Sequence, residues 1–153
     1  MPKVFEIVDF STMSNDIKRR LTDYVVSIGL FTGSQKFRVA TPESDWDYVL
    51  THEDLYRAFN IMGVNIGHIE YSDYAELFSS IKYKNLNREI NLILVEGERE
   101  VWAWEYATSI VHFSELKNDP ISRKKLFGSS LLQHYRDFCE DADILELAEE
   151  AWS

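Results

Sequence analysis

The chain has 153 residues, of which 45% are hydrophobic and 14% aromatic, so it can bury a core and is not a wholly disordered sequence. Its formal net charge of −10 argues against a large nucleic-acid-binding surface, because such surfaces need clustered lysine and arginine. Cys139 is the single cysteine, which excludes an internal disulfide.

The first half of the chain alternates between strand and helix patterns. Residues 3–10 fit either an edge strand or an ordered arm. The segments after them predict a helix over 16–25, a buried strand over 27–31, a loop or short helix over 35–43, a strand over 46–50 and a helix over 52–62. Thr51 is the expected N-cap of the helix over 52–62, and Gly63 is its expected end.

The second half becomes regular again after residues 64–76, which show no clean period. The pattern predicts strands over 77–83 and 89–95 around a turn at 84–87, and then helices over 99–113, 120–139 and 143–151. The strand over 89–95 is apolar almost throughout, which indicates burial on both faces. The helix over 99–113 is apolar on more than one face, so we expect it to be central.

Together these elements predict one domain with an α/β (α+β) fold. A mixed sheet with packed helices would occupy about residues 15–96, and a helical C-terminal part would follow over about 97–153. No apolar run approaches the ~20 residues that a membrane-spanning helix needs. The N-terminus, Met1–Glu6, carries an acid where a signal peptide would stay apolar. We therefore expect a cytoplasmic protein that does not enter a membrane.

The sequence Asp45-Trp46-Asp47 is the strongest candidate for a functional site. In an extended strand, residues two apart point to the same face, so Asp45 and Asp47 project together while Trp46 projects to the other face. Two carboxylates on one face can share a hard cation through their oxygens. The alternative is that both acids cap the loop before the strand and remain in solvent.

Gly33 and Ser34 precede this pair as a turn at the end of a predicted strand. Glycine allows the backbone to approach a phosphate oxygen closely, and Ser34 adds a hydroxyl donor. Lys36 and Arg38 follow, and they either assist phosphate binding or belong to a solvated loop. The turn and the acidic pair together suggest a site for a metal–triphosphate complex.

The order Gly33-Ser34, then Ser44-Asp45-x-Asp47 and a hydrophobic run, resembles the signature of the nucleotidyltransferase superfamily, which includes DNA polymerase beta. The resemblance covers about residues 15–96. The stretches Trp102–Thr108 and Arg123–Phe127 are more loosely similar to small nucleotidyltransferases encoded by phages.

The resemblance implies a metal-dependent transfer of a nucleoside monophosphate from an NTP to a hydroxyl. Asp45 and Asp47 would bind Mg²⁺ (or Mn²⁺), and Gly33 and Ser34 would bind the phosphates, with Lys36 and Arg38 as possible helpers. The acceptor stays open: an RNA end, a protein side chain or a small molecule.

The third acid of the family pattern is replaced by Asn91. Asparagine carries no charge and does not accept a proton near neutral pH. Glu89 lies two residues earlier on the same side of the predicted strand, about 6.6 Å away along it, and could stand in. The alternatives are a catalytically degenerate nucleotide-binding module with the same fold and a protein-interaction module.

Two further groups of residues have both a functional and a structural interpretation. Trp102, Trp104 and Tyr106 could stack a base, although their helical spacing favours a place in the core. The densest basic cluster of the chain could meet a phosphate or an RNA end, although a solvated helix face is the commoner case; it consists of Arg123, Lys124 and Lys125.

Overall fold

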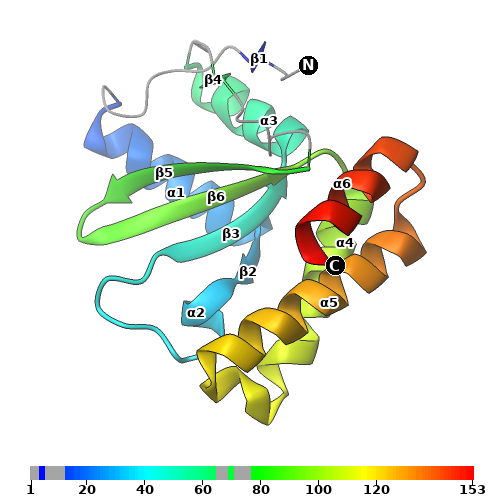
Figure 1. The fold of residues 1–153 in the computed structure, drawn as a ribbon. Helices are drawn as coiled ribbons and strands as arrows, with labels where there is room; N and C mark the ends of the chain where they lie inside the picture. Colours follow the sequence, from blue (N-terminus) through cyan, green and yellow to red (C-terminus); the bar gives the residue numbers. More distant parts are fainter. Residues whose placement is uncertain (1–3, 6–12, 65–68, 71–76) are drawn as a thin grey trace.

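A four-stranded mixed sheet forms the centre of the structure, with helices on both of its faces (Figure 1). The computed structural model describes residues 4–5, 13–64, 69–70 and 77–153. The strand order is β2-β3-β6-β5, and the strands are Leu30–Thr32 (β2), Trp46–Thr51 (β3), Ser79–Asn85 (β5) and Arg88–Val95 (β6). β3 and β6 are parallel, and each outer strand is antiparallel to its neighbour. The α+β fold that the sequence predicts is confirmed.

The helices form one layer on each face of the sheet (Figure 1). Helices α1 and α3 pack on one face, and α4, α5 and α6 pack on the other. Their bounds are Asn15–Ile28 (α1), His52–Met62 (α3), Glu98–His112 (α4), Pro120–Phe138 (α5) and Ala142–Trp152 (α6). Two shorter helical segments are Gly33–Lys36 (α2) and Glu115–Asn118 (η3).

The alternation of side chains along β3 and β6 divides the core into two clusters. Tyr48 and Leu92 belong to the cluster beneath α1 and α3, whereas Val49 and Ile93 belong to the cluster beneath α4, α5 and α6. Every residue from 90 to 95 is buried, which confirms that this strand is covered on both faces. The odd-numbered positions of β3 therefore face the C-terminal helices.

Local capping signals set the helix ends that the sequence predicts. The Thr51 hydroxyl accepts a hydrogen bond from the backbone N–H of Asp54 at 3.1 Å, and α3 ends at Gly63 in the left-handed conformation with φ +67°. Asp119 caps α5, whose first residue is Pro120. These polar and conformational preferences operate within one helical turn, so they can be read from the sequence.

Several sequence-based boundaries and burial predictions are wrong or fall partly outside the described residues. The strand predicted over 27–31 begins only at Leu30, because α1 continues to Ile28. The strand predicted over 77–83 lies two residues later, at Ser79–Asn85 (β5). The predicted helix over 99–113 is not buried all round: Trp102, Tyr106 and Ile110 of α4 are exposed. A short strand β1 (Val4–Phe5) pairs with β4 (Ile69–Glu70). Apart from these two strands and Val64, the segments 3–10 and 64–76 lie outside the described residues.

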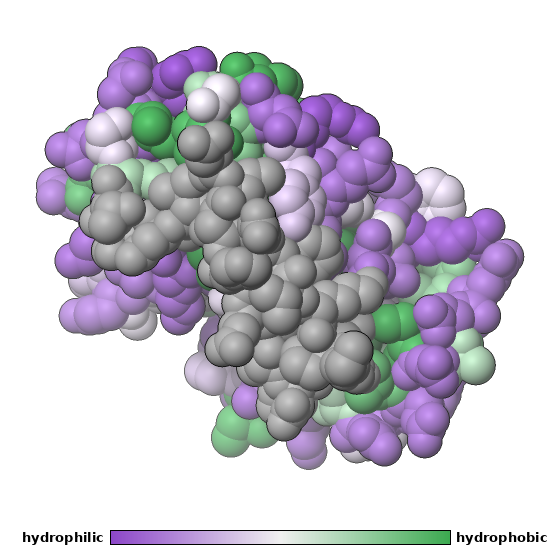
Figure 2. Space-filling view, turned by 90° about the horizontal axis from the view of Figure 1, so that it is seen from above, coloured by the Kyte–Doolittle hydropathy of each residue, from purple (hydrophilic) through white to green (hydrophobic). Residues whose placement is uncertain are grey.

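The described part of the chain contains no helix that is both long enough and apolar enough to cross a membrane. Among the residues coloured by hydropathy in the view from above, hydrophilic ones predominate, with smaller hydrophobic areas between them (Figure 2).

The layer of C-terminal helices is held together by aromatic packing around Tyr135. Tyr135 on α5 is fully buried, and its hydroxyl accepts a hydrogen bond from Trp104 Nε1 on α4 at 3.1 Å. The Trp152 ring on α6 meets Tyr135 edge-on at 5.1 Å between centroids. On the surface, Arg136 forms a two-point ion pair with Glu149 at 2.7 and 2.8 Å. Three helices therefore meet at one buried tyrosine.

We predict that Tyr135→Phe destabilises the protein by about 1–3 kcal/mol, because the buried Trp104 N–H loses its acceptor. Urea denaturation measures this change. Tyr106→Phe is the matched control, since Tyr106 is 53% exposed and removal of its hydroxyl should change stability by less than about 0.5 kcal/mol. Equal effects of the two substitutions would contradict a structural role for the Trp104–Tyr135 hydrogen bond.

Candidate functional site

A polar row crosses the sheet on the face that the C-terminal helices cover. The strand register places Thr32 opposite Asp47, Asp47 opposite Asn91, and Asn91 opposite Lys82. Asn91 Nδ2 donates a hydrogen bond to Asp47 Oδ1 at 3.0 Å. Lys82 Nζ forms an ion pair with Asp45 Oδ2 at 2.9 Å. The two acids of the Asp-x-Asp pair thus have different partners, one an amide and the other an ammonium group.

Trp46, between the two acids, belongs to the opposite face of the sheet. Its ring stacks on Phe31 at 5.9 Å, and the Arg88 guanidinium lies 4.6 Å from the ring centroid. Trp46 also packs against the core cluster beneath α1 and α3. As the sequence predicts, side chains alternate along β3: Trp46 packs into the core on one face, and Asp47 lies on the other face.

Gly33 packs directly against Asp47. Its φ is +79°, in the left-handed region that glycine adopts without strain. A Cβ atom built on Gly33 would overlap Asp47 Oδ2 and approach Asp47 Cγ to 2.9 Å. Both the backbone conformation and the lack of space therefore require glycine at this turn. The buried Thr32 hydroxyl fixes the same turn to α4 through a 2.7 Å hydrogen bond with the Thr108 hydroxyl.

Burial raises the pKa of Asp47 above its ordinary value. The hydrogen bond from Asn91 acts in the opposite direction, the charge of Asp45 adds to the rise, and the charge of Lys82 reduces it. Asn91 Oδ1 is buried and has no hydrogen-bond donor among the described residues. A partly buried carboxylate and an unpartnered amide oxygen thus lie side by side, and a cation would stabilise both.

Lys82 is the functional candidate that the sequence analysis missed. Its pKa is raised first by the hydrogen bond and charge of Asp45, and further by the charges of Glu89 and Asp47. Its ammonium group therefore supplies positive charge among three carboxylates. Along β5, Lys82 points to the opposite face of the sheet from its neighbours Ile81 and Tyr83. Its place opposite Asn91 depends on the register of β5 against β6, which the sequence does not show.

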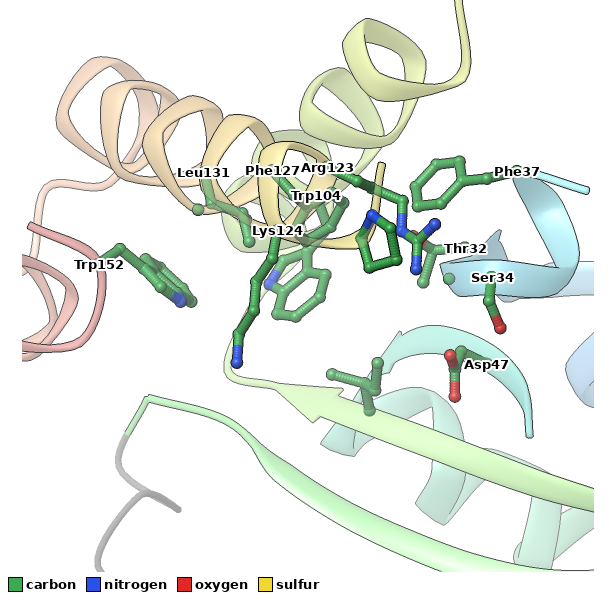
Figure 3. Close-up of a pocket in the computed structure, with 14 residues that line it drawn as sticks. Thr32, Ser34, Phe37, Asp47, Trp104, Arg123, Lys124, Phe127, Leu131 and Trp152 are labelled. Atoms are coloured by element: carbon green, nitrogen blue, oxygen red, sulfur yellow. The ribbon is translucent and has the colours of Figure 1, made fainter. Parts of the chain in front are cut away.

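A cavity of about 520 Å³ opens between this row and α5 (Figure 3). Ser34 and Asp47 lie at one end, and Arg123 and Lys124 of α5 point toward the sheet. Apolar and aromatic side chains form the remainder of the wall: Phe37, Ile93, Trp104, Phe127, Leu131 and Trp152. The cavity therefore has an end with a carboxylate, a hydroxyl and the Arg123 guanidinium, and a larger, mostly apolar end into which Lys124 projects beside Trp104 and Trp152.

Only part of the predicted residue set lines this cavity. Gly33, Ser34 and Asp47 do, as do Arg123 and Lys124 of the basic cluster. Glu89 instead lines a neighbouring polar hollow of about 300 Å³, together with Ser44 and Gln35. Lys36 and Arg38 do not line the cavity; they approach His112, at the end of α4. Among the aromatic candidates, Trp104 lines the cavity, whereas Trp102 and Tyr106 are exposed elsewhere.

The donor set suits a hard divalent cation that brings further ligands with it. Asp45, Asp47 and Asn91 offer carboxylate and amide oxygens, which Mg²⁺ and Mn²⁺ prefer. In the part of the chain that is described, no group of three or more His, Cys, Asp or Glu side chains is placed to hold a metal ion.

Comparison of the chain with protein-family models, with curated proteins and with solved structures finds no match. The function therefore has to be inferred from the chemistry of the cavity and of the polar row.

We predict that Gly33→Ala destabilises the protein more than Gly63→Ala. Both glycines have positive φ, of +79° and +67°, so each substitution carries about 1–2 kcal/mol of backbone strain. A Cβ atom at Gly63 meets nothing within 4 Å, whereas one at Gly33 overlaps Asp47. Chemical denaturation of both variants measures the difference, and equal losses would contradict the close packing of Gly33 on Asp47.

We predict that Asp47→Asn raises the melting temperature by about 2–4 °C at neutral pH. Because the pKa of Asp47 is raised on folding, the folded chain binds more protons than the unfolded chain between the two pKa values, and stability falls as the pH rises through that window. The gain should shrink as the pH falls toward the ordinary value of 3.8 and vanish well below it, where Asp47 is protonated in both states.

Asp23→Asn serves as the control for this pH series, since Asp23 is exposed on α1. It should leave the melting temperature unchanged at every pH. A lower melting temperature for Asp47→Asn than for the wild type at neutral pH would contradict the inference that the buried, charged Asp47 carboxylate destabilises the folded protein.

Proposed function

We propose that the protein is a metal-dependent nucleotidyltransferase, which moves a nucleoside monophosphate from an NTP to a hydroxyl of an acceptor. The observation that carries this proposal is the packing of the Gly33 turn on Asp47 at the mouth of a cavity to which α5 contributes Arg123 and Lys124. Carboxylates for a cation, donors for phosphates and an apolar compartment thus occur together, as an NTP requires.

The two ends of the cavity suggest how the NTP lies. The triphosphate would lie at the polar end, where it accepts a hydrogen bond from the Ser34 hydroxyl and pairs with the Arg123 guanidinium. The base would lie at the apolar end against Trp104 and Trp152. The α-phosphate, which is the phosphate nearest the base, would then lie between the two ends of the cavity.

Asp45 and Asp47 would hold the Mg²⁺ (or Mn²⁺) ion of the nucleotide, which neutralises phosphate charge when bound. Lys82 would have to release Asp45 Oδ2, or share it, when the ion enters. In the reaction, the acceptor oxygen bonds to the α-phosphorus and the bond to the β-phosphate oxygen breaks. Pyrophosphate leaves with that electron pair. The hydroxyl proton passes to solvent, because Asn91 cannot accept it.

The second candidate is a nucleotide-binding protein that does not turn the nucleotide over. Asn91 and Lys82 favour it: an amide stands where the family pattern has its third acid, and an ammonium group already pairs with Asp45. The same cavity would then serve as a sensor site or as a docking site for a partner. A cytoplasmic setting suits either candidate, since NTPs are abundant there and the only cysteine, Cys139, is buried.

The test is a thermal-shift titration with each of the four NTPs, with Mg²⁺, with Mn²⁺ and with a chelator, combined with an assay for pyrophosphate release. An NTP at a hundred times its Kd stabilises the folded state by about 2.7 kcal/mol. We expect a metal-dependent shift in the wild type that Asp45→Asn/Asp47→Asn abolishes. Asp23→Asn/Asp137→Asn removes the same charge from exposed positions and should keep the shift.

Each outcome separates the candidates. A shift with pyrophosphate release supports the transferase, whereas a shift without release, followed by release in Asn91→Asp, supports the binding protein. The absence of any shift with any NTP would rule out both and leave the acids as loop caps.

A further inference from the structure

A second cluster of cations lies beside the cavity, on the side of α2. It consists of Lys36, Arg38, His112 and Lys117, which we call the basic ridge. Lys117 Nζ donates to the backbone oxygen of His112 at 3.0 Å, and Arg123 Nη1 donates to the backbone oxygen of Lys117 at 2.8 Å. Because Arg123 also lines the cavity, the ridge and the cavity are joined by direct contacts.

The side chains of the ridge have no carboxylate partner within the described residues. Other basic side chains do pair with acids, such as Arg19 with Asp16 at 2.7 Å and Arg57 with Glu53 at 2.9 Å. Lys36 and Lys117 are nevertheless only partly exposed. Keeping unpaired, partly buried cations together costs free energy. In a chain with a net charge of −10, this arrangement points to an anionic ligand.

The cations converge on one imidazole. Partial burial, and after it the charges of Lys36, Lys117 and Arg38, lower the pKa of His112, while a hydrogen bond with the Lys36 backbone acts in the opposite direction. Its Nδ1 is buried and has no hydrogen-bond partner among the described residues. The ridge is therefore a local concentration of positive charge around an unsatisfied ring nitrogen.

An exposed aromatic residue adjoins these cations. Phe113 is 84% exposed, and its ring meets that of His112 edge-on at 4.9 Å. Cations that follow a phosphate backbone, together with aromatic rings on which bases stack, are characteristic of proteins that bind single-stranded nucleic acid. An acidic peptide would use the cations but would have no planar base to place on Phe113.

We propose that the basic ridge and Phe113 bind a short single-stranded nucleic acid, which is the acceptor of the transfer. The acceptor role rests on the proposed function, whereas the binding itself does not. The path is short: α2 begins with Gly33 and Ser34 at the cavity and carries Lys36 at its other end. A strand that lies along the ridge can bring its terminal hydroxyl to the polar end of the cavity, where Asp47 lies.

The test measures fluorescence anisotropy with labelled single strands of about ten nucleotides, one of RNA and one of DNA. Lys36→Glu/Arg38→Glu should weaken binding about tenfold or more and flatten its dependence on salt concentration. Lys18→Glu/Arg20→Glu is the matched control, because it makes the same change of charge on α1, across the sheet. Phe113→Ala should weaken binding about tenfold through lost stacking, and folding should be unaffected because Phe113 is exposed.

The outcomes distinguish this inference from the proposed function. NTP binding measured in parallel should be unchanged in Phe113→Ala. The proposal is supported if the ridge variants lose strand binding and the control keeps it, and the RNA and DNA probes then identify the preferred acceptor.

The proposal is overturned if the wild type binds neither strand at low salt, if the control loses as much binding as the ridge variant, or if poly-glutamate competes fully and Phe113→Ala has no effect. NTP binding without strand binding would overturn this inference alone, while strand binding without NTP binding would overturn the acceptor role and the proposed function.

Discussion

The contact between Gly33 and Asp47 is the constraint on which the rest of the site depends. Strand β2 ends at Thr32, opposite Asp47 near the start of the antiparallel strand β3. The chain can leave β2 across the Asp47 carboxylate only because Gly33 has no side chain and adopts a positive φ. This crossing starts α2 beside the acid. It also places Ser34 at the cavity and, further along α2, Lys36 at the basic ridge.

The sheet supplies the second element of the site, because its polar row lies at the edge of the hydrophobic cluster beneath the C-terminal helices. On that face Val49, Ile93 and Val95 are buried. The preceding positions, Asp47 and Asn91, hold polar groups that hydrogen-bond to each other. The polar row is thus the boundary of the core. It is buried enough to raise the pKa of Asp47 and open enough to meet a ligand.

The parts of this structure that depend on local sequence were predictable, and the parts that depend on register were not. Thr51, Gly63 and Pro120 act within a helical turn, and the sequence correctly placed the helix ends that they set. Asp45 and Asp47 were found through a spacing of two along one strand. Lys82 and Arg123 join them only through the β5–β6 register and the packing of α5, which no spacing within one element records. The same reason explains why Trp102 and Tyr106 were expected in the core, since apolar side chains alone do not reveal which face of α4 meets the sheet.

The wall of the cavity is also a packing layer. Trp104, Phe127 and Trp152 come from three different helices, and each contributes both to the hydrophobic cluster beneath those helices and to the surface that a ligand would touch. A ligand held between this layer and the sheet would contact both, so its binding free energy would add to that of docking the helices on the sheet. Occupancy of the cavity would then set how often the C-terminal helices detach by local unfolding, while α1 and α3 on the far face of the sheet would open independently of it.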